Sequence, residues 1–573
     1  MSDTNQAAIM HENLTRNIKG VVSDGGTVNL VDIQTAYMSG FAGLQVLGNL
    51  GETCRSGKER ARAALERIGV KLAPQRLVMG FSPADVKIDG AQMDLPMAVG
   101  LALASTGVDP TRSSASSTGP RGRSGPVVFA AEVGLGGELR PVQGIVAFAL
   151  AAAWGGAKVF VVSSDSLPEL AGVDLSPLEV LGGRDLEAVL SWLRGDDGTL
   201  QPLSAATASQ ALKASNLPDF SAMMLPPEMV KVAVAVAAGG HNLLMRGTPG
   251  SGKTMFAQRL PGIMPVLDGR PRLRCMQLHS LAGSHLDGLR AGAVPFRSPH
   301  HGASMAAVMG SNRQPGEISL AHGGILFLDE LPEFRRDLLE ALREPLESGE
   351  VHVARVGGRV VWPANAVLVA ACNNCPCGWT GSRFRMCRCP TGKALAYRAR
   401  LSGPLLDRID IHVNLPEAGD IRSRTARQGD AAVGAERVQV SSAVLAGRVA
   451  AARSFAGARW ANLGIEADTL NARLDPGRIQ VACGWGSGGE GRGLACLLDS
   501  AASDRQIPHL PDVVRSISSR GLDRALRVAR TLADMDMAEV VGYEHLRQAL
   551  LWQAEAAARQ RGEHLQVGSW RSS

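Results

Sequence analysis

The octapeptide GTPGSGKT at positions 247–254 has the residue types and spacing that grip a nucleoside triphosphate. It fits the pattern G-x-x-x-x-G-K-T, follows the apolar stretch NLLM and precedes MFAQRLPGI, which reads as a helix start. Glycines let backbone N–H groups face phosphate oxygens, and a helix N-terminus adds its positive dipole end. The sequence therefore predicts ATP and Mg²⁺ as cofactors. The residues assigned to nucleotide binding in this loop are Gly247, Thr248, Pro249, Gly250, Ser251, Gly252, Lys253 and Thr254.

Two side chains of this loop have individual roles. Lys253 is predicted to reach the β- and γ-phosphates, and the Thr254 hydroxyl is predicted to ligate Mg²⁺. Downstream, GGILFLDE (323–330) reads as a buried strand that ends in two carboxylates. Asp329 is predicted to hold Mg²⁺ through water, and Glu330 to orient and deprotonate the attacking water.

A third strand, AVLVAAC, is followed directly by Asn373. A polar side chain at the end of a strand next to the carboxylates could position the same water, although an asparagine at a strand end is more often a turn residue. The catalytic candidates are accordingly Glu330, Lys253 and Asn373.

Four cysteines lie close together in CPCGWTGSRFRMCRC: Cys375, Cys377, Cys387 and Cys389. Two C-x-C pairs on one loop can supply a tetrahedral thiolate site, and the sequence favours Zn²⁺ there. The alternative is a loop of reduced cysteines without a metal.

The stretch GEVHVARVGGRVVWPA (349–364) alternates on both sides of Gly357 and Gly358, which predicts a β-hairpin with a Gly-Gly turn. Arg355 and Arg359 flank its tip and are candidates for DNA binding; the alternative is a solvated hairpin with ordinary surface arginines. His300 and His301 stay unassigned, because adjacent residues of an extended segment point in opposite directions and do not chelate together.

The bulk properties bound the class of protein. A chain of 573 residues is too long to fold around one hydrophobic core, which predicts two to four domains. The net charge of +6 permits a nucleic-acid partner without demanding one, and 4% aromatic residues exclude numerous base-stacking platforms. The start lacks the pattern of a signal peptide, and the apolar runs are too short to span a bilayer. We expect a soluble cytoplasmic protein with no membrane partner.

These motifs need α/β scaffolds to position them. Residues 1–195 alternate between strand and helix patterns, and the small polar residues 196–222 read as a linker. A second α/β unit spans 223–415, and residues 416–573 are mostly helical. The segment LDRALRVARTLADM (522–535) carries apolar residues at helical spacing.

The whole set of motifs resembles the YifB/ComM family of magnesium-chelatase-like AAA+ ATPases. The resemblance rests on GGHNLLMRGTPGSGKTMFAQRLPGI, PFRSPHHGAS, PGEISLAHGGILFLDELPEF, LLEALREPLESGEV, NNCPCG, RLSGPLLDRIDIHV, LDRALRVARTLADM and, near the N-terminus, GFSPADVKIDGAQMDLPMAVGLALA. It implies an α/β fold class: a Lon-protease-like N-terminal domain (1–195), a central AAA+ P-loop core (223–415) and a C-terminal helical lid (416–573). It also implies a homo-hexameric ring.

The resemblance also implies roles that spacing does not reveal. Asn373 resembles sensor 1, and Arg408 resembles the arginine finger that reaches a neighbour's γ-phosphate, with Arg400 as the alternative. Arg520 resembles sensor 2, with Arg524 as the alternative. A hairpin between the LDE motif and Asn373 is implied to point into the ring's pore.

A Lon-like domain raises the hypothesis of a protease. Proteolysis there needs a serine nucleophile with a lysine base. The matching stretch VKIDGAQMDLPMAVG offers no serine or cysteine, so we expect no peptidase activity.

Three functions compete at this point. The first is a hexameric ATP hydrolase that moves on single-stranded or branched DNA and drives branch migration in recombination and natural transformation, as the ComM resemblance implies. The second is a chelatase-type motor subunit that remodels a protein partner. The third, a non-enzymatic scaffold, conflicts with the intact set Lys253, Thr254, Asp329 and Glu330.

Overall fold

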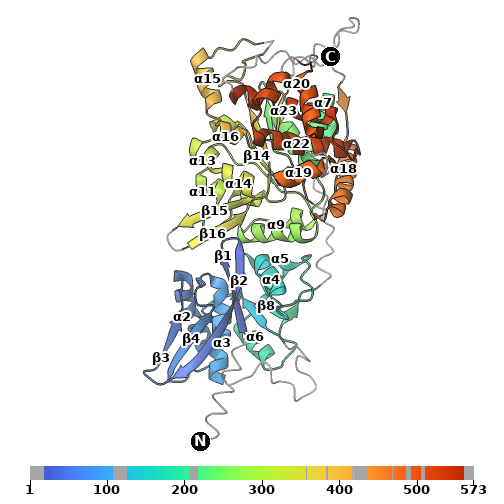
Figure 1. The fold of residues 1–573 in the computed structure, drawn as a ribbon. Coiled ribbons are helices and arrows are strands. Elements are labelled where there is room, and N and C mark those ends of the chain that lie inside the picture. Colours follow the sequence, from blue (N-terminus) through green and yellow to red (C-terminus); the bar gives the residue numbers. More distant parts are fainter. Residues whose placement is uncertain are drawn as a thin grey trace.

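A computed structural model shows how these motifs are arranged. It describes residues 18–106, 125–204, 217–355, 358–382, 385–415, 417, 437–466, 469–485, 492–504, 507 and 510–560. The chain forms an α/β unit at its N-terminal end, a central α/β unit, and a group of C-terminal helices on the central unit (Figure 1).

The N-terminal unit is built on one eight-stranded sheet in the order β10-β9-β8-β5-β1-β2-β4-β3. Neighbours β1, β5, β8 and β9 are parallel, whereas β2 runs antiparallel to both β1 and β4. The strands are β1 (Ile18–Asp24), β2 (Thr27–Met38), β3 (Gly43–Leu47), β4 (Arg76–Ser82), β5 (Val127–Ala130), β8 (Val159–Ser163), β9 (Glu179–Gly183) and β10 (Gln201–Pro202).

Helices cover both faces of this sheet. One face packs against α2 (Glu52–Arg67), α3 (Asp94–Thr106) and α6 (Leu186–Leu193) in a single apolar core. The other face packs against α4 (Ile145–Trp154), whose residues 145–150 are all buried. A helix that is apolar all round needs cover on every side, and α4 obtains it from the sheet and from α9 (Gly269–Leu281) of the central unit.

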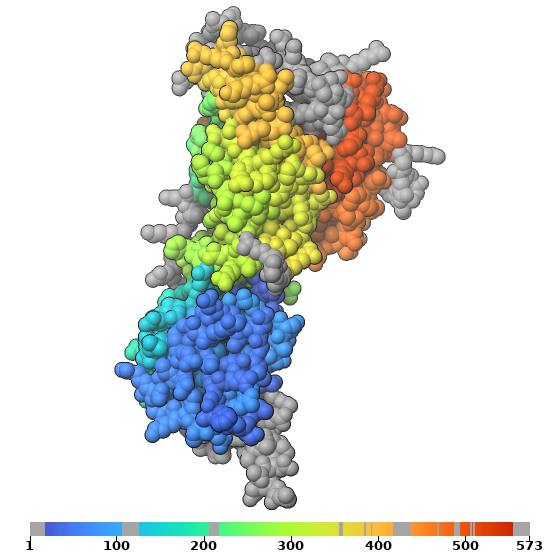
Figure 2. All heavy atoms as spheres, turned by 90° about the vertical axis from the view of Figure 1, so that its left-hand side faces the viewer, coloured from blue at the N-terminus to red at the C-terminus, as the bar shows by residue number. Residues whose placement is uncertain are grey.

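The first and central units are therefore joined by a packed interface (Figure 2). Hydrogen bonds add to it: Gln143 Nε2 donates to Leu281 O at 2.7 Å, and Val146 N donates to Ser280 Oγ at 3.2 Å. The turn between β1 and β2 also meets the central unit, because a Cβ on Gly26 would lie 2.6 Å from Val361 O.

The central unit contains five parallel strands in the order β13-β14-β17-β12-β18. Their bounds are β12 (Leu243–Arg246), β13 (Phe296–Arg297), β14 (Ile325–Leu328), β17 (Val367–Cys372) and β18 (Ile411–Asn414). Successive side chains of a strand point to opposite faces, and Leu243 and Met245 accordingly join one core while Leu244 joins the other. Both faces are covered, as a parallel sheet requires.

The C-terminal helices cover one face of this sheet together with α7 (Pro227–Gly239). They are α18 (Ser442–Asn462), α19 (Pro476–Ala482), α20 (Arg492–Ala502), α21 (Leu510–Ser516), α22 (Ser519–Met535) and α23 (Tyr543–Gln560). Side chains fix where several of them begin: Ser441 accepts from Val444 N, and Ser518 from Gly521 N. Among the helices that the structure describes, none has the length and apolarity to cross a membrane.

Two parts of the stretch 196–222, predicted to be a linker, lie in folded units. Gln201 and Pro202 form the outermost strand β10 of the first sheet, and Leu203 N donates to Val180 O at 3.0 Å. Phe220 is fully buried in the core of the central unit. The small and polar composition of this stretch did not predict these contacts. Backbone pairing in β10 and the burial of one aromatic side chain change the composition very little. Residues 205–216 lie outside the described residues.

Candidate active site

The phosphate loop connects β12 to α8 (Lys253–Arg259), as the motif requires. Gly250 and Gly252 have φ angles of 77° and 92°, a conformation that side chains with a Cβ rarely adopt. The loop therefore needs glycine at these two positions. The Thr248 hydroxyl is buried and has no hydrogen-bond partner among the described residues. An unpaired buried hydroxyl in a loop of this shape fits a phosphate-bearing ligand.

Lys253 lies inside this loop. Its Nζ donates to Gly247 O and Thr248 O, each at 2.9 Å, and to Asn373 Oδ1 at 3.2 Å. Burial lowers the pKa of Lys253. The ammonium is thus held over the loop by neutral oxygens, where a triphosphate would supply the negative charge that they lack.

The two residues predicted to hold Mg²⁺ are in contact. Thr254 Oγ1 donates to Asp329 Oδ2 at 2.7 Å, which joins the start of α8 to the end of β14. A hydroxyl and a carboxylate are oxygen ligands of the kind that Mg²⁺ takes, so this pair fits the ion.

Glu330 follows Asp329 with a φ of 52°, in the left-handed region that few residues other than glycine adopt. Such a backbone turns the side chain out of the line of the strand, and the carboxylate is half exposed. Its Oε2 lies 3.4 Å from Nδ1 of His301, a residue that the sequence left unassigned.

His301 is the site residue that sequence reasoning missed. It lies in the loop after β13, and β13 is the strand next to β14, which carries Asp329 and Glu330. Its ring packs on His300 at a centroid distance of 4.1 Å and meets Phe334 edge-on at 6.5 Å. The expectation that the two histidines point in opposite directions is therefore wrong, because they lie in a loop and not in a strand. The loop that carries His301 follows the strand next to β14. This position could have predicted His301 as a site residue, because the carboxyl ends of neighbouring parallel strands meet at one edge of a sheet.

Asn373 lies at the carboxyl end of β17, between β14 and β12 in the strand order. This order brings it beside Lys253 and near the two carboxylates. Its proposed action on the attacking water stays a prediction.

The predicted arginines form a different group. Arg408 and Arg520 line one cavity of about 380 Å³ together with Arg473, Arg524 and Arg527. Within the described chain, none of residues 247–254 is among its lining residues. Arg408 forms an ion pair with Glu347 and donates through Nη1 to Pro404 O at 2.8 Å. Burial lowers the pKa of Arg473 and of Arg524. Arg400, the alternative to Arg408, lies elsewhere and pairs with Glu333 at 3.3 Å.

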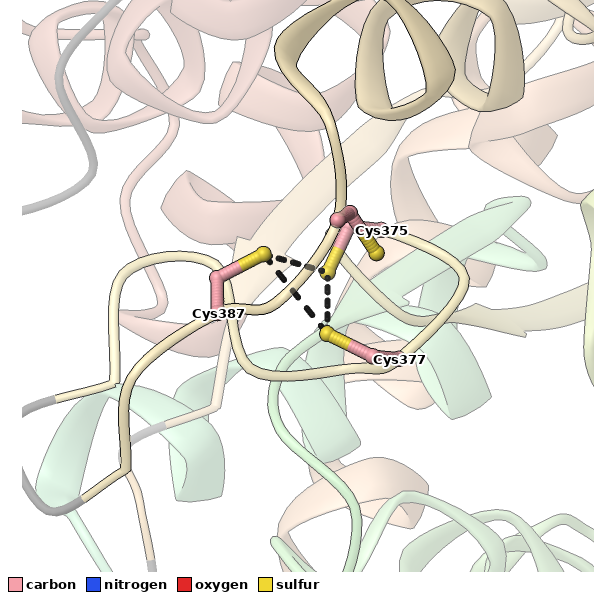
Figure 3. Close-up of side chains that lie close together, drawn as sticks. Cys375, Cys377 and Cys387 are labelled. Carbon is pink, nitrogen blue, oxygen red and sulfur yellow. Dashed lines mark hydrogen bonds between the residues drawn. The ribbon is translucent and has the colours of Figure 1, made fainter.

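The cysteine cluster lies a few residues after Asn373. The sulfurs of Cys375, Cys377 and Cys387 are 3.4 to 3.6 Å apart (Figure 3). Cys389 completes a group whose sulfurs all lie within 4.8 Å of one another. Zinc–sulfur bonds of about 2.3 Å in a tetrahedron place sulfurs about 3.7 Å apart, so the spacing fits Zn²⁺. Hydrogen bonds from the backbone of Trp379 and Arg388 lower the pKa of Cys377 to about 6, whereas burial and the neighbouring Cys377 thiol raise the pKa of Cys389 to about 11.

The predicted hairpin is present as β15 (Glu350–Arg355) and β16 (Gly358–Pro363). The Gly357-Gly358 turn is shifted by one residue: Gly358 pairs with Arg355, so the connection is 356–357, which lies outside the described residues. The exposed Arg359 places Nη2 2.9 Å from His352 Nδ1. The side chain of Arg355 also lies outside the described part.

In the first unit, the stretch examined for a protease nucleophile holds a buried carboxylate. Asp94, at the start of α3, accepts from Arg60 Nε at 2.8 Å. Burial raises the pKa of Asp94 to about 6.

Comparison with known proteins agrees with this arrangement. A family described as magnesium chelatase, subunit ChlI, matches residues 219–422, and its C-terminal counterpart matches residues 439–553. A third family, subunit ChlI of Mg-chelatase, matches residues 33–166. The protein YifB of Salmonella typhimurium is 34% identical over 91% of this chain and 94% of its own length. The competence protein ComM of Haemophilus influenzae is 30% identical over 93% of this chain and 96% of its own length.

The chain belongs to the YifB/ComM family of magnesium-chelatase-like proteins. Members of this family are AAA+ ATPases, and the P-loop with its five-stranded parallel sheet is the corresponding fold. ATP and Mg²⁺ are the cofactors that such an ATPase uses, in agreement with the residues at the phosphate loop.

Proposed function

We propose that this YifB/ComM-family protein is a ring-forming motor that couples ATP hydrolysis to movement on DNA, and that it drives branch migration. The observation that carries the ring is the grouping of Arg408 and Arg520 in a cavity away from the chain's own phosphate loop. The Arg408 guanidinium placed there suits the γ-phosphate of a neighbouring subunit better than that of its own, and Arg520 keeps its assignment as sensor 2 on the lid. The choice of DNA rests on the competence protein among the relatives and on the arginines of the β15–β16 hairpin.

Each residue of the site has a part in hydrolysis. The loop amides and Lys253 bind the phosphates, and Thr254 and Asp329 hold Mg²⁺, which neutralises charge that develops on the phosphate oxygens. Glu330 takes a proton from the attacking water, and Asn373 orients that water. Arg408 of a neighbouring copy stabilises the transferred group, as an arginine supplied in trans does.

The domain assignment completes the proposal. Residues 1–195 form a Lon-protease-like domain without peptidase activity, 223–415 the AAA+ core and 416–573 the helical lid. Of the predicted linker 196–222, β10 belongs to the first unit and Phe220 to the central unit. The buried Arg60–Asp94 pair supports the absence of proteolysis, because Asp94 stands at the start of α3 within the stretch that matches the protease fold. A carboxylate held by a guanidinium is not an acyl-transfer nucleophile paired with a lysine.

We also assign Zn²⁺ to Cys375, Cys377, Cys387 and Cys389, from the closeness of the four sulfurs. Elemental analysis of the purified protein should find about one zinc per chain, since one tetrahedral thiolate site holds one ion. A content well below half would remove this assignment.

A second function has a specific observation in its favour. All three matching families are described by the chelatase subunit ChlI, which favours a motor that remodels a protein partner. The relatives that match over nearly the whole chain are YifB and ComM, so we place the DNA motor first.

The test is ATP hydrolysis by the purified protein without DNA, with single-stranded DNA and with a four-way junction. Strong stimulation by either DNA supports the DNA motor, and junction unwinding supports branch migration. Equal rates in all three conditions would contradict the proposal and favour the chelatase-type function.

A further inference from the structure

The cysteine cluster lies next to the nucleotide site. Asn373 contacts Lys253, and Cys375 follows only two positions later, fully buried. The loop that begins there returns to the phosphate loop at Gly378. A Cβ on Gly378 would lie 2.5 Å from Cγ of Pro249, so the two loops are in the closest contact that a glycine allows.

Hydrogen bonds link the sulfurs to the residues beside Asn373. Thr380 donates from its backbone N to Cys375 Sγ at 3.3 Å and from Oγ1 to Cys387 Sγ at 3.1 Å. The carbonyl of Thr380 accepts from Asn374 Nδ2 at 3.1 Å. Asn374 is in turn held through its own carbonyl by Arg398 Nε at 2.9 Å. The positions of the sulfurs therefore set the backbone that carries Asn373.

Surface contacts also hold this loop: Ser382 Oγ donates to Glu417 Oε1 at 2.5 Å, and the Arg385 guanidinium lies 4.7 Å from the centre of the Trp379 ring. The segments 375–382 and 385–389 contain no helix or strand, and Cys377, Cys387 and Cys389 are partly exposed. A tetrahedral metal site would add four bonds to these contacts and fix the loop more firmly than they do alone.

We propose that the metal site is a support for the nucleotide pocket: zinc on the four thiolates fixes the loop against Pro249 and Asn373, and so strengthens binding of ATP. This inference rests on the zinc assignment made above. Binding of Zn²⁺ forms four Zn–S bonds and releases to solvent the protons that the thiols still carry. Loss of the metal should leave the fold of the central sheet intact and increase the mobility of the segments that carry Pro249 and Asn373.

The first experiment compares Cys387→Ser with Cys496→Ser, because Cys496 is an exposed cysteine of α20 outside the cluster. Zinc content is measured together with the Kd of a non-hydrolysable ATP analogue, with circular dichroism as the check on folding. We expect Cys387→Ser to lose zinc and to bind the analogue about 10-fold more weakly, because small displacements of a binding group are costly. Cys496→Ser should match the wild type in both measurements.

The second experiment leaves all four ligands in place. Gly378→Ala puts a methyl group into the contact with Pro249, and Gly464→Ala is the matched control. Both glycines have positive φ angles, of 83° and 66°, but a Cβ on Gly464 meets nothing within 4 Å. We expect Gly378→Ala to keep its zinc and to weaken analogue binding, and Gly464→Ala to change neither.

The outcomes separate the two claims. A wild-type protein without zinc would overturn the zinc assignment. Zinc lost from Cys387→Ser with an unchanged Kd would leave the assignment standing and overturn the support role. Unchanged binding in a zinc-loaded Gly378→Ala variant would overturn the support role as well.

Discussion

At the scale of the residue, the site is a set of polar side chains that four strands bring to one edge of a sheet. Lys253 was predictable from the phosphate-loop motif after β12. Asp329 and Asn373 were predictable because each stands directly after an apolar strand and the carboxyl ends of parallel strands share an edge. His301 was not, because its strand β13 is only two residues long and leaves no pattern. Its contact with Glu330 depends on the pairing of β13 with β14, which no short motif records.

Lys253 and Glu330 should fail in different ways. Lys253→Ala removes the cation at the phosphates, and we expect loss of nucleotide binding in an ATP-analogue titration. Glu330→Gln keeps the size of the side chain but not the base, so it should bind ATP and hydrolyse it at least about 100-fold more slowly. Normal turnover in Glu330→Gln would remove it as the base.

His301 tests whether the contact with Glu330 positions the base. His301→Ala should lower kcat by about 10-fold with little change in KM, because a displaced carboxylate affects the chemical step and not binding. His301→Asn, which retains a polar side chain, should recover part of the rate. His285→Ala is the control, since His285 is an exposed histidine after α9. A change confined to KM would assign His301 to nucleotide binding instead.

Asp94 makes stability depend on pH. Its folded-state pKa of about 6 lies above the ordinary aspartate value of 3.8, so the folded protein binds the proton more tightly. This contribution is therefore present at low pH and is lost as the pH rises through about 4 to 6, by about 3 kcal/mol in total. Asp94→Asn cannot titrate, and urea unfolding at several pH values should show a smaller loss of stability over this window than in the wild type. Equal pH dependence in both proteins would contradict burial as the cause.

At the scale of the element, the hairpin and the linker show what sequence pattern does and does not fix. Alternation around two glycines predicted β15 and β16, but Gly358, predicted for the turn, pairs with Arg355 as the first residue of β16, because cross-strand pairing decides where the strand begins. Residues 196–222 were predicted as linker from composition, although β10 and Phe220 belong to folded units. Contacts made by a two-residue strand or by one buried aromatic side chain depend on tertiary structure, so local sequence does not predict them.

The hairpin arginines should couple hydrolysis to DNA. Arg355→Ala combined with Arg359→Ala removes two cations from each hairpin, which should abolish most of the stimulation by DNA and leave basal ATP hydrolysis unchanged. Arg62→Ala in α2, an exposed arginine of the first unit, is the control. The measurement is the ATPase rate against DNA concentration, and full stimulation in the double variant would contradict a role of the hairpin.

At the scale of the whole molecule, the arginine cavity depends on parts of the chain that meet only after folding. Arg408 precedes β18, whereas Arg520 and Arg524 lie on α22, and the packing of the C-terminal helices on the central sheet brings them together. The sequence could propose each arginine by resemblance, but not their shared cavity or its separation from the phosphate loop.

This separation predicts complementation between subunits. Arg408→Ala and Glu330→Gln should each be nearly inactive alone. In a one-to-one mixture, about a quarter of the interfaces in a random ring pair an intact Glu330 with an intact Arg408 of the neighbour, so ATP hydrolysis should reappear. A mixture as inactive as its components would place Arg408 in its own subunit's site or show that no ring forms.

The turn at Gly25 and Gly26 touches β16 at Val360 and Val361, and α4 is wedged between the first sheet and α9. A pull on the hairpin is therefore passed mechanically into an eight-stranded sheet rather than into a free loop. In the proposed motor, the hairpin is thus anchored on a packed α/β unit whose stiffness resists its displacement.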